Sequence, residues 1–214
     1  MGTGLPSLSI IFFSSADPGH GAARYAEILR AAELADRLGF EAVWLPERHY
    51  HPFGGLFPSP AVLATAVAAR TTRIAVRAGS VVVPLHDPAA IAEEWAMVDV
   101  LSGGRAGLSL ATGWNRGDFA TARCDFAERR EYTFTAVDTL RALWRGEAAK
   151  VGDGEAVRTF PAPVQRELPL WLTATSGPAT FEEAGRRGCG VLTAYLQLDR
   201  PALRRNVAAY RSAL

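Results

Sequence analysis

The stretch RIAVRAGSVVVPLHDPAAIAEEWAMVDVLSGGRAGLSLAT, residues 73–112, contains one complete strand–helix–strand unit. Residues 73–83 are rich in β-branched side chains and predict a buried strand. Asp87 and Pro88 favour the start of a helix, Gly103 and Gly104 favour its end, and residues 106–112 predict a second strand. Such a unit is typical of a parallel sheet with helical crossovers. The predicted helix directs these residues toward the core: Ile91, Trp95, Val98 and Leu101.

The same alternation continues along the rest of the chain. An apolar helix face ending at Leu38 is followed by Gly39, which favours the helix end there. Asp125 and Glu128 resemble a capping box in front of a helix that ends near residue 144. Asp199 is the expected N-cap of the last helix. Further strands are predicted at residues 8–13, 41–46, 168–174 and 191–195, and further helices at 23–38, 60–70 and 178–187.

The number of predicted strands bears directly on the fold class. A closed barrel of alternating strands and helices has eight strands and about 250 residues, whereas this chain of 214 residues supplies about six. We therefore expect an α/β protein of the (β/α)8 TIM-barrel type, incomplete, with about six of eight βα units. A doubly wound open sheet is consistent with the same alternation. We expect one domain over residues 1–214, with a polar excursion at about 146–163.

Composition narrows the class of protein further. The chain is 49% hydrophobic and 21% charged with a net charge of +1, which is typical of a globular protein and favours neither nucleic acid nor membrane as a partner. Cys124 and Cys189 match no metal-ligand spacing. The cysteines therefore give no reason to expect a metal. We expect a cytoplasmic protein, because neither a signal peptide nor a long apolar run is recognised.

The loop after the second predicted strand carries the densest set of reactive side chains. Glu47, Arg48 and His49 follow that strand directly, and His51 comes shortly after them. Active sites of parallel α/β proteins lie at the carboxyl ends of strands, and histidine suits proton transfer near neutral pH. Two alternatives are a loop held by Glu47–Arg48 hydrogen bonds and a metal site at His49 and His51, which lacks an obvious third ligand.

Three other strand ends are consistent with a cofactor pocket. Small residues at 78–80 (Ala78, Gly79, Ser80) would let a planar ring approach the backbone. Residues 112–115 include Thr112, with Trp114 as a pocket wall and Asn115 as a hydrogen-bonding group. At Ser176, Gly177 and Thr180, hydroxyl groups meet a helix start, which fits phosphate binding and an ordinary N-cap equally well. The Gly-x-Gly at residues 2–4 precedes the first strand, and the dinucleotide, P-loop and serine-hydrolase motifs are absent from the sequence.

Together these segments resemble the luciferase-like monooxygenase family, in particular its natural-product biosynthesis branch, in a C-terminally shortened form. The resemblance is carried by residues 43–55 (VWLPERHYHPFGG), 77–88 (RAGSVVVPLHDP), 92–105 (AEEWAMVDVLSGGR), 113–119 (GWNRGDF) and 170–180 (LWLTATSGPAT). It implies reduced FMN bound with its phosphate at Ser176, Gly177 and Thr180. Its ring would pass over residues 78–80, where family members often have a cis non-proline peptide. Phe12 or Phe13 would line the pocket together with Trp114.

The resemblance also implies a chemistry. Reduced FMN from a separate reductase would react with O₂, and a C4a-(hydro)peroxyflavin would oxygenate a small or carrier-protein-bound natural-product intermediate. The family's Glu-His-His motif matches Glu47, Arg48 and His49, so Arg48 replaces the usual catalytic base and His49 becomes the candidate. A homodimer would form through the Ala-rich segments 61–69 and 89–96. Alternatives are a non-catalytic flavin-binding truncated barrel and a deazaflavin-dependent oxidoreductase. The short length fits a fragment, a megaenzyme domain, a natural short barrel or two chains completing one another.

Overall fold

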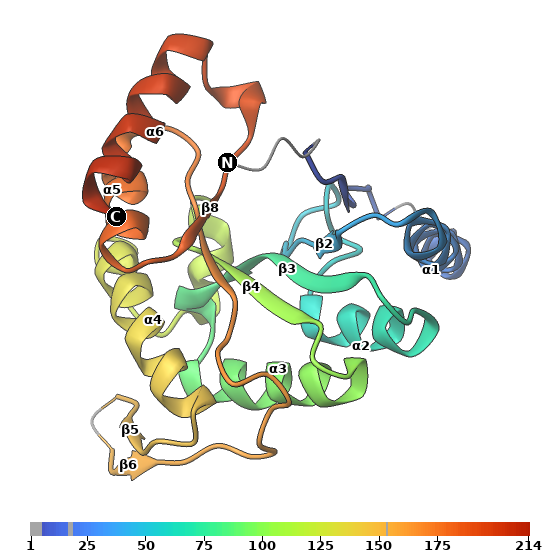
Figure 1. Ribbon diagram of the computed structural model, residues 1–214, viewed down its shortest axis with the longest axis horizontal. Helices are drawn as coiled ribbons and strands as arrows, with labels where there is room; N and C mark the ends of the chain where they lie inside the picture. Colours follow the sequence, from blue (N-terminus) through green and yellow to red (C-terminus); the bar gives the residue numbers. More distant parts are fainter. Residues whose placement is uncertain (1–5, 17–18, 153) are drawn as a thin grey trace.

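A computed structural model describes residues 6–16, 19–152 and 154–214. Its main sheet has six strands in the order β1-β2-β3-β4-β7-β8, and every neighbouring pair is parallel. Figure 1 shows that this sheet curls and that helices cover its outer side. The prediction of an incomplete barrel with six strands is therefore confirmed. The strands are β1 (Ser9–Ile11), β2 (Ala42–Leu45), β3 (Ala75–Val82), β4 (Ala106–Ala111), β7 (Leu170–Thr173) and β8 (Gly190–Leu192).

The helices lie at the predicted places in the chain. They are α1 (Gly21–Leu38), α2 (Pro60–Arg70), α3 (Pro88–Ser102), α4 (Arg129–Trp144), α5 (Pro178–Arg186) and α6 (Arg200–Ala213), with 3-10 turns η1 (Val83–Leu85), η2 (Arg116–Thr121) and η3 (Tyr195–Gln197). The polar excursion contains β5 (Ala149–Lys150) and β6 (Ala156–Val157), which form a separate antiparallel pair. Among the described residues, none of the helices combines the length and apolarity required to cross a bilayer.

Helix ends follow the local sequence at most positions. Asp87 accepts a hydrogen bond from the Ala89 N–H at 2.8 Å, and Asp199 accepts one from the Ala202 N–H at 2.6 Å, so both are side-chain N-caps. Gly103 ends α3 in the left-handed conformation at φ 69°, which a residue without Cβ adopts readily. These local interactions fix where each crossover begins and ends.

Three details of the helix predictions are wrong. No capping box precedes α4: Glu128 is the N-cap without a side-chain hydrogen bond among the described residues, and its N–H donates to the backbone oxygen of Asp125 in a turn. Leu38 and Leu101 are 66% and 56% exposed rather than part of the core. Each lies in the last turn of its helix, so helical periodicity alone overestimates how far the buried face extends.

The concave side of the sheet is filled by two tryptophans and an arginine. The Arg77 guanidinium lies 5.1 Å from the ring centre of Trp44 and 4.6 Å from that of Trp171, and it forms an ion pair with Glu41 at 2.9 Å. Trp171 fits because Gly190 has no side chain: a Cβ there would lie 2.2 Å from the indole. This layer forms the floor beneath the carboxyl ends of the strands.

A buried carboxylate on α3 attaches the returning excursion to the sheet. Asp99 is fully buried. It accepts hydrogen bonds from the backbone N–H groups of Val164 and Gln165 at 2.8 and 2.9 Å, and from Gln165 Nε2 at 2.7 Å. Charge-assisted hydrogen bonds of this kind compensate the desolvation of the carboxylate.

We predict that Asp99→Asn lowers the free energy of unfolding by about 2–4 kcal/mol, because an amide donor would then face backbone donors in a buried site. Chemical denaturation followed by circular dichroism measures the effect. Asp125→Asn is the matched control, since Asp125 is exposed and surface changes cost little. Equal stability of the two variants would contradict the anchoring role of Asp99.

Candidate functional site

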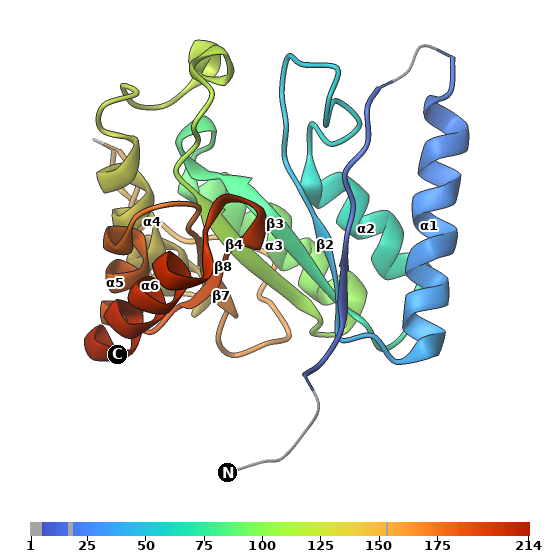
Figure 2. The same cartoon turned by 90° about the horizontal axis from the view of Figure 1, so that it is seen from above.

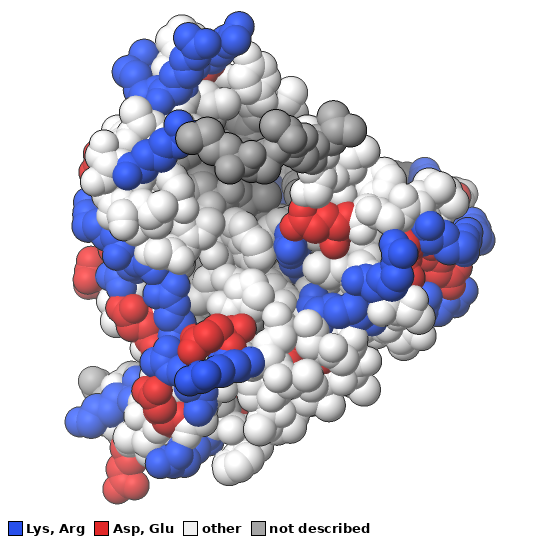
Figure 3. Space-filling view, viewed as in Figure 1, with Lys and Arg blue, Asp and Glu red and all other residues white. Residues whose placement is uncertain are grey.

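A cavity of about 650 Å³ opens at the carboxyl ends of the strands. Figure 2 shows the loops that follow β2 and β4 at this same end of the molecule. Figure 3 displays the opposite face of the molecule, at the amino ends of the strands, so the mouth of this cavity lies on the side turned away from the viewer. The predicted site residues that line the cavity are Phe13, Glu47, Gly79, Ser80, Thr112 and Trp114.

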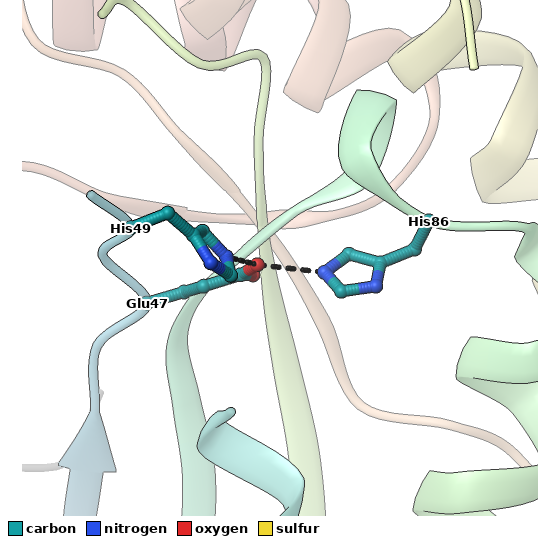
Figure 4. Close-up of side chains that lie close together, drawn as sticks. All are labelled: Glu47, His49 and His86. Atoms are coloured by element: carbon teal, nitrogen blue, oxygen red, sulfur yellow. Dashed lines mark hydrogen bonds and ion pairs between the residues drawn. The ribbon is translucent and has the colours of Figure 1, made fainter. Parts of the chain in front are cut away.

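At one wall of the cavity, a single carboxylate oxygen joins two imidazoles. Glu47 Oε1 lies 2.6 Å from His49 Nε2 and 2.6 Å from His86 Nε2, as Figure 4 shows. Its Oε2 accepts a hydrogen bond from the Val82 N–H at 2.7 Å. The Glu47 side chain is fully buried, whereas the two imidazoles are 20% and 29% exposed. Because an ionised carboxylate only accepts, both imidazoles donate through Nε2 and leave Nδ1 for another partner.

The electrostatics of this cluster favour the charged carboxylate. Burial by itself raises the pKa of Glu47, but hydrogen bonds from His49, His86 and Val82 together hold that pKa below its ordinary value. Burial lowers the pKa of His86, yet the hydrogen bond and charge of Glu47 raise it above the ordinary value overall. An ionised Glu47 therefore stabilises a proton on its imidazole neighbour.

His86 is the site residue that sequence reasoning missed. It follows η1, immediately before the N-cap of α3, and its backbone oxygen accepts a hydrogen bond from Tyr132 Oη at 3.0 Å. Its position in the sequence could have identified it, because His86 follows the third predicted strand and Glu47 follows the second, which is expected to be its neighbour in the sheet. Neighbouring parallel strands deliver their carboxyl ends to the same edge, which brings these two loops together.

Arg48 contacts Trp114, which forms one wall of the cavity, and pairs with Asp118. Its guanidinium lies 4.8 Å from the Trp114 ring centre, and Nη1 lies 3.8 Å from Asp118 Oδ2. Asn115 Nδ2 donates to the other Asp118 oxygen at 2.7 Å. The alternative of a loop held by Glu47–Arg48 hydrogen bonds is therefore wrong, since Glu47 bonds the imidazoles and Arg48 pairs with Asp118. Arg48, His49 and Asn115 support the wall rather than line the cavity.

The small residues of β3 leave room at the cavity floor. Ala78 is fully buried, while Gly79 and Ser80 line the cavity and are joined by a cis peptide, as the family resemblance implies. A Cβ on Gly79 would lie 3.0 Å from that of Trp44, so this position has no space for a side chain. Just after β1, Phe13 lines the cavity, whereas Phe12 packs against the core.

Hydroxyl groups from three strands form a hydrogen-bonded chain below the cavity. Thr173 Oγ1 bonds the Ser80 hydroxyl and lies 2.7 Å from that of Ser109, which is fully buried. Thr175 and Thr193 add further hydroxyls to the lining, and the Thr193 hydroxyl is buried without a hydrogen-bond partner among the described residues. This side of the cavity can therefore bind a polar ligand edge.

The start of α5 lies at the rim beyond these hydroxyls. Gly177 is its N-cap, and Pro178 occupies the first turn. Neither Thr175 nor Ser176 caps the helix through its side chain, so the N-cap alternative is wrong. Thr180 Oγ1 accepts a hydrogen bond from Arg130 Nη2 at 3.2 Å. Ser176, Gly177 and Thr180 thus lie together at an open helix start beside an arginine, although outside the cavity lining itself.

A curled parallel sheet with helices on its outer side and a cavity across its strand ends defines an α/β-barrel protein, a class in which active sites lie at the carboxyl ends of the strands. The chain belongs to the luciferase-like monooxygenase family, whose model matches residues 7–214. This match confirms the resemblance inferred from the strand-end segments.

Three known proteins illustrate the relationship. The oxygenase component of flavin-dependent trigonelline monooxygenase from Acinetobacter baylyi is 26% identical over 195 residues, covering 88% of this chain and 54% of that protein. F420-dependent glucose-6-phosphate dehydrogenase from Nocardia farcinica is 32% identical over 179 residues, covering 78% of this chain and 52% of that protein. The structure of monooxygenase RslO1 from Streptomyces bottropensis superposes with a TM-score of 0.89 at 28% identity, covering 97% of this chain and 65% of RslO1. This chain therefore spans roughly half to two thirds of the length of these relatives.

We predict that Thr173→Val lowers the free energy of unfolding by about 1–3 kcal/mol, because the buried Ser109 hydroxyl loses its partner at nearly constant volume. Thr173→Ser keeps the hydroxyl and is the matched control. Urea denaturation of both variants measures the difference. A valine variant as stable as the serine variant would show that the hydroxyl chain contributes nothing to stability.

Proposed function

We propose that this chain forms the flavin-binding part of an FMN-dependent monooxygenase, which uses reduced FMN and O₂ to oxygenate a small or carrier-bound natural-product intermediate. The observation that carries the proposal is the cavity across the strand ends, with small residues, hydroxyl groups and an open helix start along one side. Flavin-dependent relatives support the cofactor class.

The residues present fit FMN. At the rim, backbone N–H groups of the first turn of α5, the Ser176 and Thr180 hydroxyls and Arg130 offer donors and positive charge for a phosphate. Within the cavity, the surface at Gly79 is flat because it lacks a side chain, and Trp114 provides an aromatic wall. When bound there, reduced FMN would supply the electrons that activate O₂.

The chain's own residues would transfer a proton, and the cavity lining bears on how far water is excluded. Glu47 binds Nε2 of both His49 and His86, so Nδ1 is the nitrogen of each imidazole that would exchange a proton with a group bound near this wall. His49 is the proposed proton-transfer residue, and Arg48 supports it by keeping the Trp114 wall in place. Ile11 and Phe13 line the cavity but are 52% and 55% exposed, so bound flavin would have to cover them before water near the reacting atoms is limited.

Two other functions remain candidates because specific observations favour them. The F420-dependent relative favours a deazaflavin-dependent oxidoreductase. The outer strands β1 and β8 each pair with one neighbour only among the described residues, and these free edges favour a flavin-binding truncated barrel without catalysis. These candidates differ in the electron acceptor, since only the monooxygenase consumes O₂.

The proposed partners and location follow the family resemblance. We propose a separate flavin reductase, a cytoplasmic setting and a homodimer formed through α2 and α3. Val62 on α2 and Met97 on α3 are 72% and 54% exposed, which supports an apolar contact on this side.

The decisive experiment incubates the purified chain with FMN, a flavin reductase and NADH under ¹⁸O₂, with a natural-product extract as substrate source. We expect O₂ uptake coupled to ¹⁸O in an organic product. Hydride transfer to a deazaflavin without O₂ would favour the F420 candidate, and tight FMN binding without coupled oxygenation would favour the non-catalytic one.

For the phosphate site, we predict that Ser176→Ala combined with Thr180→Ala weakens FMN binding by about 1–3 kcal/mol, the scale of hydrogen bonds to a charged group. Tryptophan fluorescence during FMN titration measures the affinity. Thr135→Ala combined with Ser212→Ala is the matched control, because both side chains lie on other helix surfaces. Unchanged affinity in the first variant would move the phosphate elsewhere.

For proton transfer, we predict that His49→Ala lowers turnover about 10²–10⁴-fold, the usual contribution of a general acid or base, while FMN affinity stays nearly constant. His51→Ala is the control, because the His51 imidazole accepts a hydrogen bond from the Phe53 N–H away from Glu47. Oxygen uptake and FMN titration measure the two effects separately. A collapse of FMN affinity would instead show a structural role for His49.

A further inference from the structure

We propose that Glu47, His49 and His86 form a binding site for a divalent transition-metal ion of the Zn²⁺ type. Two imidazole nitrogens and one carboxylate oxygen would be the protein ligands, and bound metal would replace the hydrogen-bonded protons of the cluster. The proposal depends on this geometry alone, so it stands independently of the proposed oxygenase function.

The three potential ligand atoms converge from two separate segments. His49 Nε2, His86 Nε2 and one Glu47 oxygen all lie within 4.8 Å of one another. Zinc ligands at about 2.0–2.2 Å in a tetrahedral arrangement are about 3.3 Å apart. Each imidazole would therefore withdraw about 0.7 Å from Glu47 Oε1, its present neighbour at 2.6 Å. Because both imidazoles are partly exposed, small side-chain rotations suffice.

Surrounding contacts orient the ligands as in established metal sites. The second oxygen of Glu47 is fixed by the Val82 N–H at 2.7 Å, and the backbone at His86 is fixed by Tyr132 at 3.0 Å. Outer contacts of this kind hold ligands in place and raise metal affinity. Glu47 also lines the cavity, so a fourth coordination position would be open to water or a ligand from that side.

The donor set selects the class of ion. Two imidazoles with one carboxylate suit Zn²⁺, Co²⁺, Ni²⁺ or Cu²⁺, whereas Mg²⁺ and Ca²⁺ prefer all-oxygen sites. The sequence paired His49 with His51, but the structure instead brings His49 together with Glu47 and His86. His51 itself is engaged with the Phe53 N–H at 3.1 Å and takes no part in the cluster.

Metal binding would remove this cluster from proton exchange. Coordination would occupy Nε2 of both imidazoles and the shared carboxylate oxygen, so the remaining proton of each neutral imidazole would sit on Nδ1, which could then no longer accept a proton. Zinc would therefore act on this wall of the cavity without touching the residues at the α5 rim, which lie on a different element.

The test is a titration of the purified, flavin-free chain, stripped with a chelator, with Co²⁺ and then Zn²⁺. We expect one Co²⁺ per chain with the intense visible absorption of tetrahedral coordination, displaced by one equivalent of Zn²⁺. Glu47→Gln and His86→Ala should each weaken Zn²⁺ binding at least about 10–100-fold, the scale reported for perturbed metal sites. His51→Ala is the control and should bind as the unaltered chain does.

The outcomes are separable from those of the flavin experiments. Absence of saturable binding near one equivalent, or unchanged binding in His86→Ala, would overturn the metal site, whatever the chain does with FMN. Circular dichroism melting verifies that each variant is folded. If Glu47→Gln fails to fold, His86→Ala and His49→Ala provide the same comparison, because both imidazoles are partly exposed.

Discussion

Because every pairing in the six-stranded sheet is parallel, each strand delivers its carboxyl end to the same edge of the molecule. The chemistry of this chain depends on that constraint. Glu47 and His86 are 39 residues apart in sequence, yet their side chains meet because β2 and β3 are neighbours in register. The same constraint places the Thr173 hydroxyl from β7 beside Ser80 and Ser109 from β3 and β4. A reversed strand would remove its contribution from the cavity altogether.

The cluster around Glu47 shows how burial and hydrogen bonding oppose one another. A carboxylate with a fully buried side chain is costly unless it is paired, and here three donors surround its two oxygens. Pairing keeps the group charged, and the charge in turn favours a proton on the imidazole beside it. The proposed proton exchange and the proposed metal coordination would therefore be alternative uses of one arrangement, since a proton and a metal ion compete for the lone pairs of the same imidazoles.

The sequence predicts the order of strands and helices well, because apolar runs alternate with clear caps such as Asp87 and Gly103. It also predicts that residues after β2, β3 and β4 face a common cavity. The sequence does not show which residues far apart in the chain come into contact. His86 and the buried Asp99 depend on partners 39 and 65 or more residues away, and no local pattern marks such pairs. Leu101 fails for a related reason, since periodicity identifies a helix face but not where the neighbouring element stops covering it.

A flavin oxygenase must both bind its flavin and exclude water, and the open side between the outer strands β1 and β8 affects these two requirements differently. Binding a flavin requires a site that contacts its ring and its phosphate, and in the function proposed above β3, β4, β7 and the α5 rim would provide it. Oxygenation also requires that water be kept from the reacting atoms. On the side between β1 and β8 the lining includes exposed Ile11, at 52%, and Leu196, at 97%, so this side of the cavity is covered least. Flavin affinity and oxygenation can therefore diverge in this chain, and coupled ¹⁸O incorporation carries more weight than a flavin spectrum alone.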